Sequence, residues 1–362
     1  MISERTYSKD WIESFRRKKE YSKINPPLLE KMIYAFSLLE MLSGSGLDFI
    51  FKGGTSLLLM PVDSDRFSVD IDIITKKTKE ELEQYIEKSI ETSVFTSYIE
   101  DTGRVNKGGV PKAHYIFKFN AVCNMDGNIL LDVLFEKNPY VTLVKTEIKC
   151  DYIETTEPAF EVTIPSVNSI LGDKLTAFAP NTTGVPYWMQ LPDRPDKRIE
   201  IIKQLYDVSN LISHCTDIVE TKQVFEKIAN HQIQYRNLMI GANDVIDDIF
   251  NTALVLAKRD KNIQEPEKTC FFELQTGIKM FENYLIKSKF RIEQAIDASA
   301  KVAYFSQFMK DKPEFDFELF SPDSDVFSKE ITGTEYNFLN RLKKTNKQAF
   351  FYWYKYFEVS GI

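Results

Sequence analysis

The sequence predicts a protein of the α+β or α/β class, in which a small mixed sheet flanked by helices is followed by a mainly helical C-terminal domain. Two observations support this prediction. Between residues 47 and 165, short runs with the alternating pattern of strands are mixed with helical segments. From Ser166 onward, the apolar residues recur at helical spacing. A length of 362 residues suits two domains, and 43% hydrophobic residues supply their cores.

Composition and charge exclude several classes of protein. Gly and Pro number only 14 each, which excludes collagen-like and disordered chains. No apolar run approaches the roughly 18 residues that cross a bilayer, and the charged first residues lack a signal sequence, so we expect a cytoplasmic protein without a membrane partner. Four scattered cysteines and three histidines argue against a zinc site. With a net charge of −7, any nucleic acid would have to bind at a local basic patch.

The N-terminal elements follow from their boundary residues. Residues 7–44 are expected to form two helices, of which the second begins at Pro26-Pro27, a usual place for proline. Thr78-x-x-Glu81 is a capping box and predicts the start of another helix. Between these helices the sequence predicts a strand, a Gly-Gly turn, a short helix and a second strand, at 47–51, 53–54, 55–60 and 68–74.

The remaining elements are two further strands and a series of helices. The strands are expected at 114–121 and 128–135, with a turn at Asp126-Gly127-Asn128. Beyond Ser166, irregular loops are expected at 181–195 and 311–328, where prolines gather. The rest is helical, and the aromatic run at 350–357 is expected to be a core helix rather than a base-stacking surface.

The segment Phe51-Lys52-Gly53-Gly54-Thr55-Ser56 is typical of a phosphate site. Two glycines between a strand and a helix let backbone amides approach a phosphate closely. The N-terminus of the helix adds partial positive charge, and Thr55 or Ser56 can supply a hydroxyl group. Taken alone, the Gly-Gly pair could also be an ordinary turn.

Three aspartates in strand-like segments indicate a metal site. Asp70 and Asp72 are two residues apart, so on a strand they point the same way, and their mutual repulsion favours a cation between them. Asp132 lies in the apolar run Leu130–Leu134, where a charge needs a partner or a metal. If the two strands are neighbours, the three carboxylates could hold two Mg²⁺ ions about 4 Å apart, as in phosphoryl transfer. The alternative for Asp132 is a pairing with an arginine or a backbone amide.

A Gly-Gly-[Ser/Thr] turn, an Asp-x-Asp strand and a lone strand Asp resemble the DNA-polymerase-β-like nucleotidyltransferase superfamily. Within it, Gly53-Gly54-Thr55-Ser56-Leu57 and Arg66-x-Ser68-x-Asp70-x-Asp72 look like the AbiEii/AbiGii toxin family of type IV toxin–antitoxin systems. Lys174-Leu175-x-Ala177 resembles the family's lysine motif, and Tyr206-Asp207-Val208-x-x-Leu211 its later helix motif. Where family members often have Arg-Asp ahead of Tyr-Asp, this chain has Lys203-Gln204.

The resemblance implies both a domain organisation and a reaction. A nucleotidyltransferase domain with its N-terminal helices would span residues 1–212, and a helical domain residues 213–362, with the active site in the cleft between them. The enzyme would transfer a nucleoside monophosphate from an NTP to an RNA acceptor, with tRNA as the expected one. The cofactor would be Mg²⁺ or Mn²⁺, and the partner a cognate antitoxin of the winged-helix regulator type.

The resemblance also implies roles for individual residues. The catalytic residues would be Asp70, Asp72, Asp132, Lys174 and Asp207, of which the first three would bind the metal. The nucleotide-binding residues would be Gly53, Gly54, Thr55, Ser56, Arg66, Ser68 and Lys174.

Some of these residues also have structural interpretations. Lys174 could be a solvated helix lysine, Asp207 a surface carboxylate paired with Lys203, and Arg66 a structural residue. The histidines, among them His114, are expected to be packing or surface residues.

Other functions also remain open. They are nucleotidyl transfer to a protein or a small molecule, an inactive nucleotide-binding fold, and a sugar transferase with an Asp-x-Asp motif.

Overall fold

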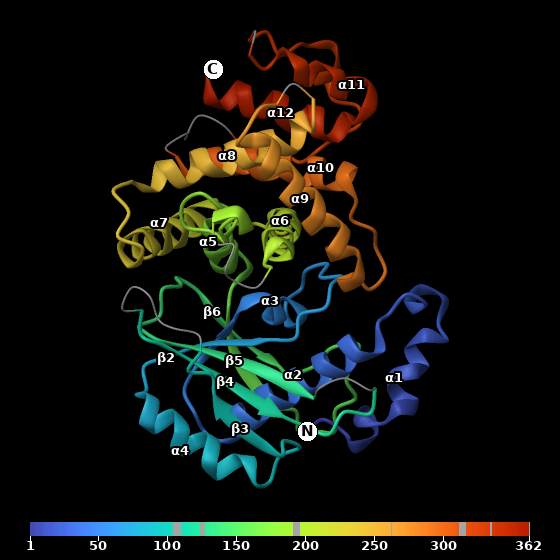
Figure 1. The fold of residues 1–362 in the computed structure, drawn as a ribbon, viewed down its shortest axis with the longest axis vertical. Coiled ribbons are helices and arrows are strands. Elements are labelled where there is room, and N and C mark those ends of the chain that lie inside the picture. The colour runs from blue at the N-terminus through green and yellow to red at the C-terminus, as the bar shows by residue number, and fades with distance from the viewer. Residues whose placement is uncertain are drawn as a thin grey trace. The chain divides into compact units, whose positions relative to one another are not determined.

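The computed structural model describes residues 1–103, 110–123, 127–190, 196–261, 263–310, 316–333 and 335–361. These residues form two compact units. The first consists of Met1–Ser166 and Asn283–Ser288, and the second of Val167–Glu282 and Lys289–Ile362. The first unit is a mixed α/β unit and the second is helical, which confirms the predicted fold class (Figure 1).

The boundary between the units lies at Ser166, and not at residue 212 where the sequence motifs end. The reason is packing. Helices α5 (Val167–Ala177) and α6 (Arg198–Ile212) carry two of the motifs, but they pack against each other and against further helices of the second unit. A motif shows which residues share chemistry, whereas a compact unit depends on which apolar faces cover one another.

A five-stranded mixed sheet forms the centre of the first unit, with the strand order β1-β2-β5-β4-β3. Strand β2 runs parallel to β5, and the other neighbouring pairs are antiparallel. The strands are β1 (Ile50–Lys52), β2 (Ile71–Thr75), β3 (Ser97–Glu100), β4 (Lys112–Lys118) and β5 (Asn128–Phe135). Four of them coincide with the strands that the sequence predicts, and β3 was not predicted. A separate antiparallel pair consists of β6 (Leu143–Glu147) and β7 (Glu161–Pro165).

One face of the sheet forms the core of the first unit. Ile73, Leu131 and Tyr115 lie on this face and are buried. Helix α2 (Pro26–Gly44) packs against β2 and β5, and α4 (Lys79–Ile90) supplies Glu83, which accepts a hydrogen bond from the Tyr115 hydroxyl at 3.1 Å. Most side chains of the other face are half-buried or exposed, so polar residues can lie there.

The predicted start of helix α4 is confirmed. The Thr78 hydroxyl accepts a hydrogen bond from the Glu81 backbone amide at 3.2 Å, and the Glu81 carboxylate accepts one from the Thr78 amide at 2.8 Å. These reciprocal bonds satisfy two amides that have no partner within the helix.

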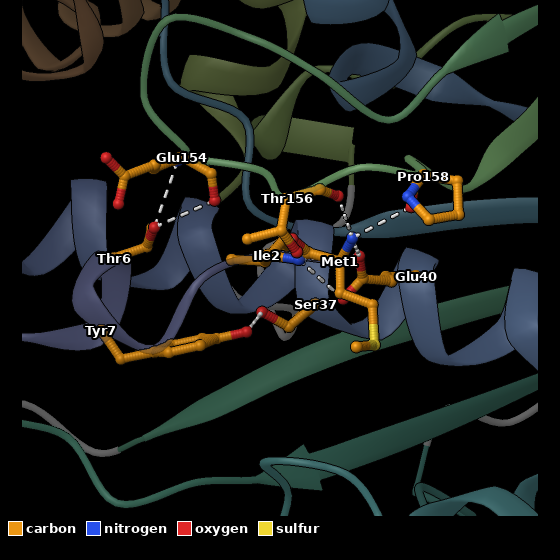
Figure 2. Close-up of polar contacts among 9 residues, drawn as sticks. All are labelled: Met1, Ile2, Thr6, Tyr7, Ser37, Glu40, Glu154, Thr156 and Pro158. Atoms are coloured by element: carbon orange, nitrogen blue, oxygen red, sulfur yellow. Dashed lines mark hydrogen bonds and ion pairs between the residues drawn. The ribbon is translucent and has the colours of Figure 1, made fainter.

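The first residues of the chain are bound to α2 and to the segment before β7 (Figure 2). The Met1 amino group donates to the Thr156 carbonyl at 2.8 Å, and the Ile2 amide donates to the Glu40 carboxylate at 2.9 Å. The Tyr7 hydroxyl lies 2.9 Å from that of Ser37 on α2. Further elements of this region are η1 (Glu4–Tyr7), α1 (Lys9–Arg16) and η2 (Lys19–Tyr21).

A short segment far along the chain, Asn283–Ser288, belongs to the first unit, although the sequence predicted helical material there. Its backbone pairs with the segment that precedes β2. The Phe67 amide donates to the Tyr284 carbonyl at 2.8 Å, and the Ile286 amide donates to the Asp65 carbonyl at 3.1 Å. These bonds hold the stretch that carries Arg66 and leads to Asp70.

The second unit consists of helices around a core of aliphatic and aromatic side chains. The aromatic run expected to be a core helix is α12, where Phe350, Phe351 and Trp353 are almost completely buried. Helix α12 spans Lys347–Ser360. Besides α5 and α6, the other helices are α7 (Ile218–Tyr235), α8 (Ala242–Lys258), α9 (Glu267–Phe281), α10 (Ile292–Ser306) and α11 (Leu342–Thr345). Among the described residues, no helix is both long and apolar enough to cross a membrane.

Two buried carboxylates fix the loop between α5 and α6. Asp248 on α8 accepts hydrogen bonds from the Asn181 amide at 2.8 Å and from the Thr182 hydroxyl at 2.9 Å. Glu273 on α9 accepts from the amides of Trp188 and Met189, at 2.6 and 2.7 Å. Residues 191–195 of this predicted loop, 311–315 of the later one and Asp126 of the predicted turn lie outside the described residues.

The contact between Glu40 and the first residues of the chain predicts a loss of stability in Glu40→Ala. Because the amide of Ile2 would lose a charged acceptor, we expect the free energy of unfolding to fall by about 1–3 kcal/mol. Denaturant unfolding measures it. Glu13→Ala on the exposed side of α1 is the matched control, and an equal loss in both variants would contradict this account.

Candidate active site

The Gly-Gly turn lies between β1 and a helix of a single turn, α3 (Gly53–Ser56), which continues as η3 (Leu57–Leu59). Gly53 has a φ of +80°, which favours glycine, and a Cβ atom there would overlap the carboxylate of Asp72. A Cβ atom at Gly54 would overlap the guanidinium group of Arg66 and the hydroxyl of Ser68. The two glycines therefore allow Asp72, Arg66 and Ser68 to lie directly against the turn.

The helix after the glycines is shorter than the sequence predicted. The expected helix was 55–60, whereas α3 has four residues and ends at Ser56. Its backbone dipoles add up over only one turn, so the partial charge expected at its N-terminus is small.

The hydroxyl groups of Thr55 and Ser56 are bound within the protein. Thr55 donates to the backbone carbonyl of Asp70 at 2.7 Å, and Ser56 donates to the carbonyl of Gly53 at 2.9 Å. Both side chains are completely buried. Thr55 therefore ties the turn to the segment that leads into β2, and Ser56 closes the turn on itself.

Asp70 lies just before β2 and not within it, although the sequence predicted a strand over 68–74. Its carbonyl accepts from Thr55, so this bond takes the place of a ladder bond. Asp70 is exposed, whereas Asp72 is half-buried on the strand.

A row of polar side chains crosses the half-buried face of the sheet. Asp72 on β2 is in register with Asp132 on the parallel strand β5. Because residues in register on neighbouring strands point to the same face, the two carboxylates are adjacent, as the sequence predicted for neighbouring strands. The row across four strands consists of Lys52, Asp72, Asp132 and His114.

The sequence reasoning did not identify the partner of Asp132. The Nδ1 atom of His114 lies 2.6 Å from the Asp132 carboxylate, and the two side chains are 14% and 32% exposed. The alternative considered for Asp132 was an arginine or a backbone amide. Only the register between β4 and β5 shows that His114 lies opposite Asp132. The spacing of residues along the sequence does not give this register.

Arg66 is buried at 3% exposure and donates through Nη1 to the carbonyl of Phe67 at 3.0 Å. Its backbone forms a bridge with Leu285. These contacts favour the structural interpretation of Arg66, as a residue that supports the Gly-Gly turn. Ser68, half-buried, also lies against this turn.

The second unit holds the other predicted pair. The ammonium group of Lys174 on α5 lies 2.7 Å from the carboxylate of Asp207 on α6, and the side chains are only 7% and 1% exposed. Lys174 is therefore not a solvated lysine, and Asp207 is not a surface carboxylate. Lys203, the other partner considered for Asp207, forms an ion pair with Glu200 at 2.9 Å.

Gln204 completes this pair. The ammonium group of Lys174 donates to the Gln204 side-chain carbonyl at 3.4 Å. The family that the sequence resembles often has Arg-Asp where this chain has Lys203-Gln204. The acceptor that contacts Lys174 here is therefore the neutral side chain of Gln204.

A model of the AbiEii nucleotidyl transferase toxin family, from type IV toxin–antitoxin systems, matches residues 37–295. The chain belongs to this family. It is a toxin nucleotidyltransferase, and family membership implies a nucleotide substrate and an antitoxin.

Two solved structures resemble the fold. MenT4, a nucleotidyltransferase toxin from Mycobacterium tuberculosis, is 12% identical with a TM-score of 0.50, and the match covers 84% of this chain and 90% of that one. A protein from H. pylori that has been assigned as a nucleotidyltransferase is 13% identical with a TM-score of 0.43, and the match covers 79% of this chain and 95% of that one. A search of curated proteins found no significant match.

Nucleotidyltransferases of this family generally use a divalent metal. Among the described residues, no three His, Cys, Asp or Glu side chains are grouped so as to hold an ion, so the sharing of two ions by three aspartates stays a prediction. The donor set itself fits, since Asp72 and Asp132 are in register on neighbouring strands and supply two carboxylates. Mg²⁺ is usually held by one or two carboxylates together with substrate phosphates and water, and not by an all-protein cage.

The contact between Gly53 and Asp72 predicts that Gly53→Ala inactivates the enzyme. We expect a loss of about 100-fold in the transfer rate, because the new methyl group displaces the carboxylate of Asp72. Gly46→Ala is the matched control, since Gly46 has a similar φ of +82° and nothing near its Cβ position. Both variants should lose about 1–2 kcal/mol of stability through backbone strain. Equal activity of the two variants would contradict the prediction.

The buried Lys174–Asp207 pair predicts that the two residues are coupled in stability. Lys174→Met or Asp207→Leu alone should cost about 3–5 kcal/mol, because each leaves an unpaired buried charge, and the double variant should recover most of this loss. Denaturant unfolding measures the three variants. Glu200→Leu removes a more exposed pair on the same helix and should cost less than about 1 kcal/mol. Additive losses in the double variant would refute the coupling.

Proposed function

We propose that this toxin uses Mg²⁺, or Mn²⁺ in its place, to transfer a nucleoside monophosphate from an NTP to an RNA acceptor, with tRNA as that acceptor. The observation that carries the proposal is the row of Asp72 and Asp132 beside the Gly-Gly turn. A triphosphate brings oxygens that complete the coordination of an ion held by carboxylates.

The proposed reaction is a displacement at the α-phosphorus. An oxygen of an acceptor hydroxyl forms a bond to this phosphorus, and the bond to the oxygen that bridges to the β-phosphorus breaks. Pyrophosphate leaves, and the proton of the hydroxyl passes to solvent. A bound divalent ion would neutralise charge on the phosphates and lower the pKa of the attacking hydroxyl.

The residues of this chain position the reactants. Asp70, Asp72 and Asp132 would hold the ion, and the backbone at Gly53 and Gly54 would approach the phosphates. Thr55 and Ser56 support this turn from inside the protein. Arg66 and Ser68 lie against Gly54 and keep the turn in place.

Lys174 would contact the triphosphate through its ammonium group. Asp207 and Gln204 hold this group at its end, which orients it before the nucleotide binds. A lysine that is already positioned needs no reorganisation when the phosphate arrives.

The biological consequence follows from the acceptor. A nucleotide added to a tRNA end blocks its use in translation, so transfer in the cytoplasm would stop growth. The family implies an antitoxin, which would be a regulator of the winged-helix type.

Incubation of the purified protein with radiolabelled NTPs, Mg²⁺ and total tRNA tests the proposal. We expect label on tRNA with the wild type, no label after chelation of the metal, and a loss of at least about 1000-fold in the Asp70→Ala/Asp72→Ala variant, since both carboxylates that hold the metal are removed.

Label on a protein band or on a small product would instead support a different acceptor. Label on tRNA that persists in the double variant would refute the assignment of the site. The absence of transfer to any acceptor would favour an inactive nucleotide-binding fold.

A further inference from the structure

His114 lies directly opposite Asp132 in the sheet. Strand β4 is antiparallel to β5, and the register pairs these two residues. Directly opposite residues of neighbouring strands have Cβ atoms about 5 Å apart, so their side chains can meet without any distortion of the backbone.

The contact between the two side chains is short. His114 Nδ1 lies 2.6 Å from the Asp132 carboxylate oxygen Oδ1. An ionised carboxylate has no hydrogen to give, so Nδ1 carries the hydrogen and donates it. The bond engages one oxygen of the carboxylate. Because the carboxylate is planar and rigid, holding this oxygen also restricts the position of the other one.

The bond adds His114 to the pair of adjacent carboxylates. Asp132 has Asp72 in register on one side and His114 in register on the other. The histidine is 14% exposed, against 32% for the carboxylate, so its ring lies deeper than the group it contacts. A ring held in this way is a rigid support, because few alternative rotamers fit beside a packed sheet.

We infer that His114 is a positioning residue for the nucleotidyl transfer, which holds the carboxylate of Asp132 in the orientation that the reaction needs. This inference rests on the proposed function, because it gives Asp132 its role. In this role His114 acts through Asp132 and not by contact with substrate or ion. Hydrogen bonds from such outer residues to a ligating group commonly change metal affinity or activity by about 10- to 100-fold when they are removed.

Two substitutions of His114 separate positioning from packing. His114→Leu removes the donor but keeps an apolar side chain on the strand. His114→Asn keeps a donor, since its amide nitrogen lies close to the position of Nδ1. We expect His114→Leu to lower kcat by about 10- to 100-fold with little change in the KM for the NTP, and His114→Asn to recover most of the rate.

A second readout does not need an RNA acceptor. Binding of Mn²⁺ in the presence of a non-hydrolysable NTP analogue is measured by electron paramagnetic resonance. We expect His114→Leu to weaken Mn²⁺ binding by about 10-fold, and His114→Asn to bind Mn²⁺ nearly as the wild type does.

A double-mutant cycle tests whether His114 acts through Asp132. In the Asp132→Asn background, His114→Leu should cause no further loss of rate or of Mn²⁺ binding, because the group it positions is gone. Thermal unfolding checks that the variants are folded. His231→Leu on α7 is the matched control for the loss of a histidine, and we expect its rate and Mn²⁺ binding to match those of the wild type.

Several results would overturn the inference. They are a folded His114→Leu variant with the rate and Mn²⁺ binding of the wild type, a folded His114→Asn variant as defective as His114→Leu, or additive losses in the cycle. If the wild type itself transfers no label, the proposed function fails, while Mn²⁺ binding still decides the role of His114.

Discussion

The parallel pairing of β2 with β5 is the constraint on which the candidate site of the first unit depends. It places Asp72 and Asp132 in register, and the antiparallel neighbours add Lys52 and His114 to the same row. A shift of either strand by one residue would turn its aspartate toward the apolar face that packs on α2, where an unpaired charge is costly. The burial of residues such as Leu131 on one face therefore also determines where the carboxylates lie on the other.

The turn that faces this row is supported from two sides. Thr55 connects it to the segment before β2, Ser56 bonds within the turn, and Arg66 and Ser68 lie against Gly54. The stretch around Arg66 is in turn paired with Asn283–Ser288. The motif residues therefore divide into a few that can meet a ligand and a larger number that hold the backbone in place. Polar residues of a motif need not all touch the substrate, because a close approach of backbone to phosphate requires such support.

In the helical unit, the charged residues of the motifs are buried and not half-exposed. Lys174 and Asp207 are both almost completely buried and pair at 2.7 Å, with Gln204 as a further acceptor. Two charges removed from water are far less costly as a pair than alone, so each residue depends on the other. The family resemblance identified both residues. The sequence alone left open that both lie on the surface of the protein. Helical periodicity shows which face a residue occupies, and it does not show which helix covers that face.

Local patterns were sufficient for the elements themselves. The capping box at Thr78, four strands of the mixed sheet, the Gly-Gly turn and the aromatic core helix all follow from residues near one another in the chain, since these features depend on short-range sterics and hydrogen bonds. The tertiary structure alone decided that His114 meets Asp132, that a segment after α9 joins the first unit, and that the units divide at Ser166. Each of these depends on the register or packing of segments far apart in sequence, where many pairings satisfy the local pattern and only the burial of the whole core selects one.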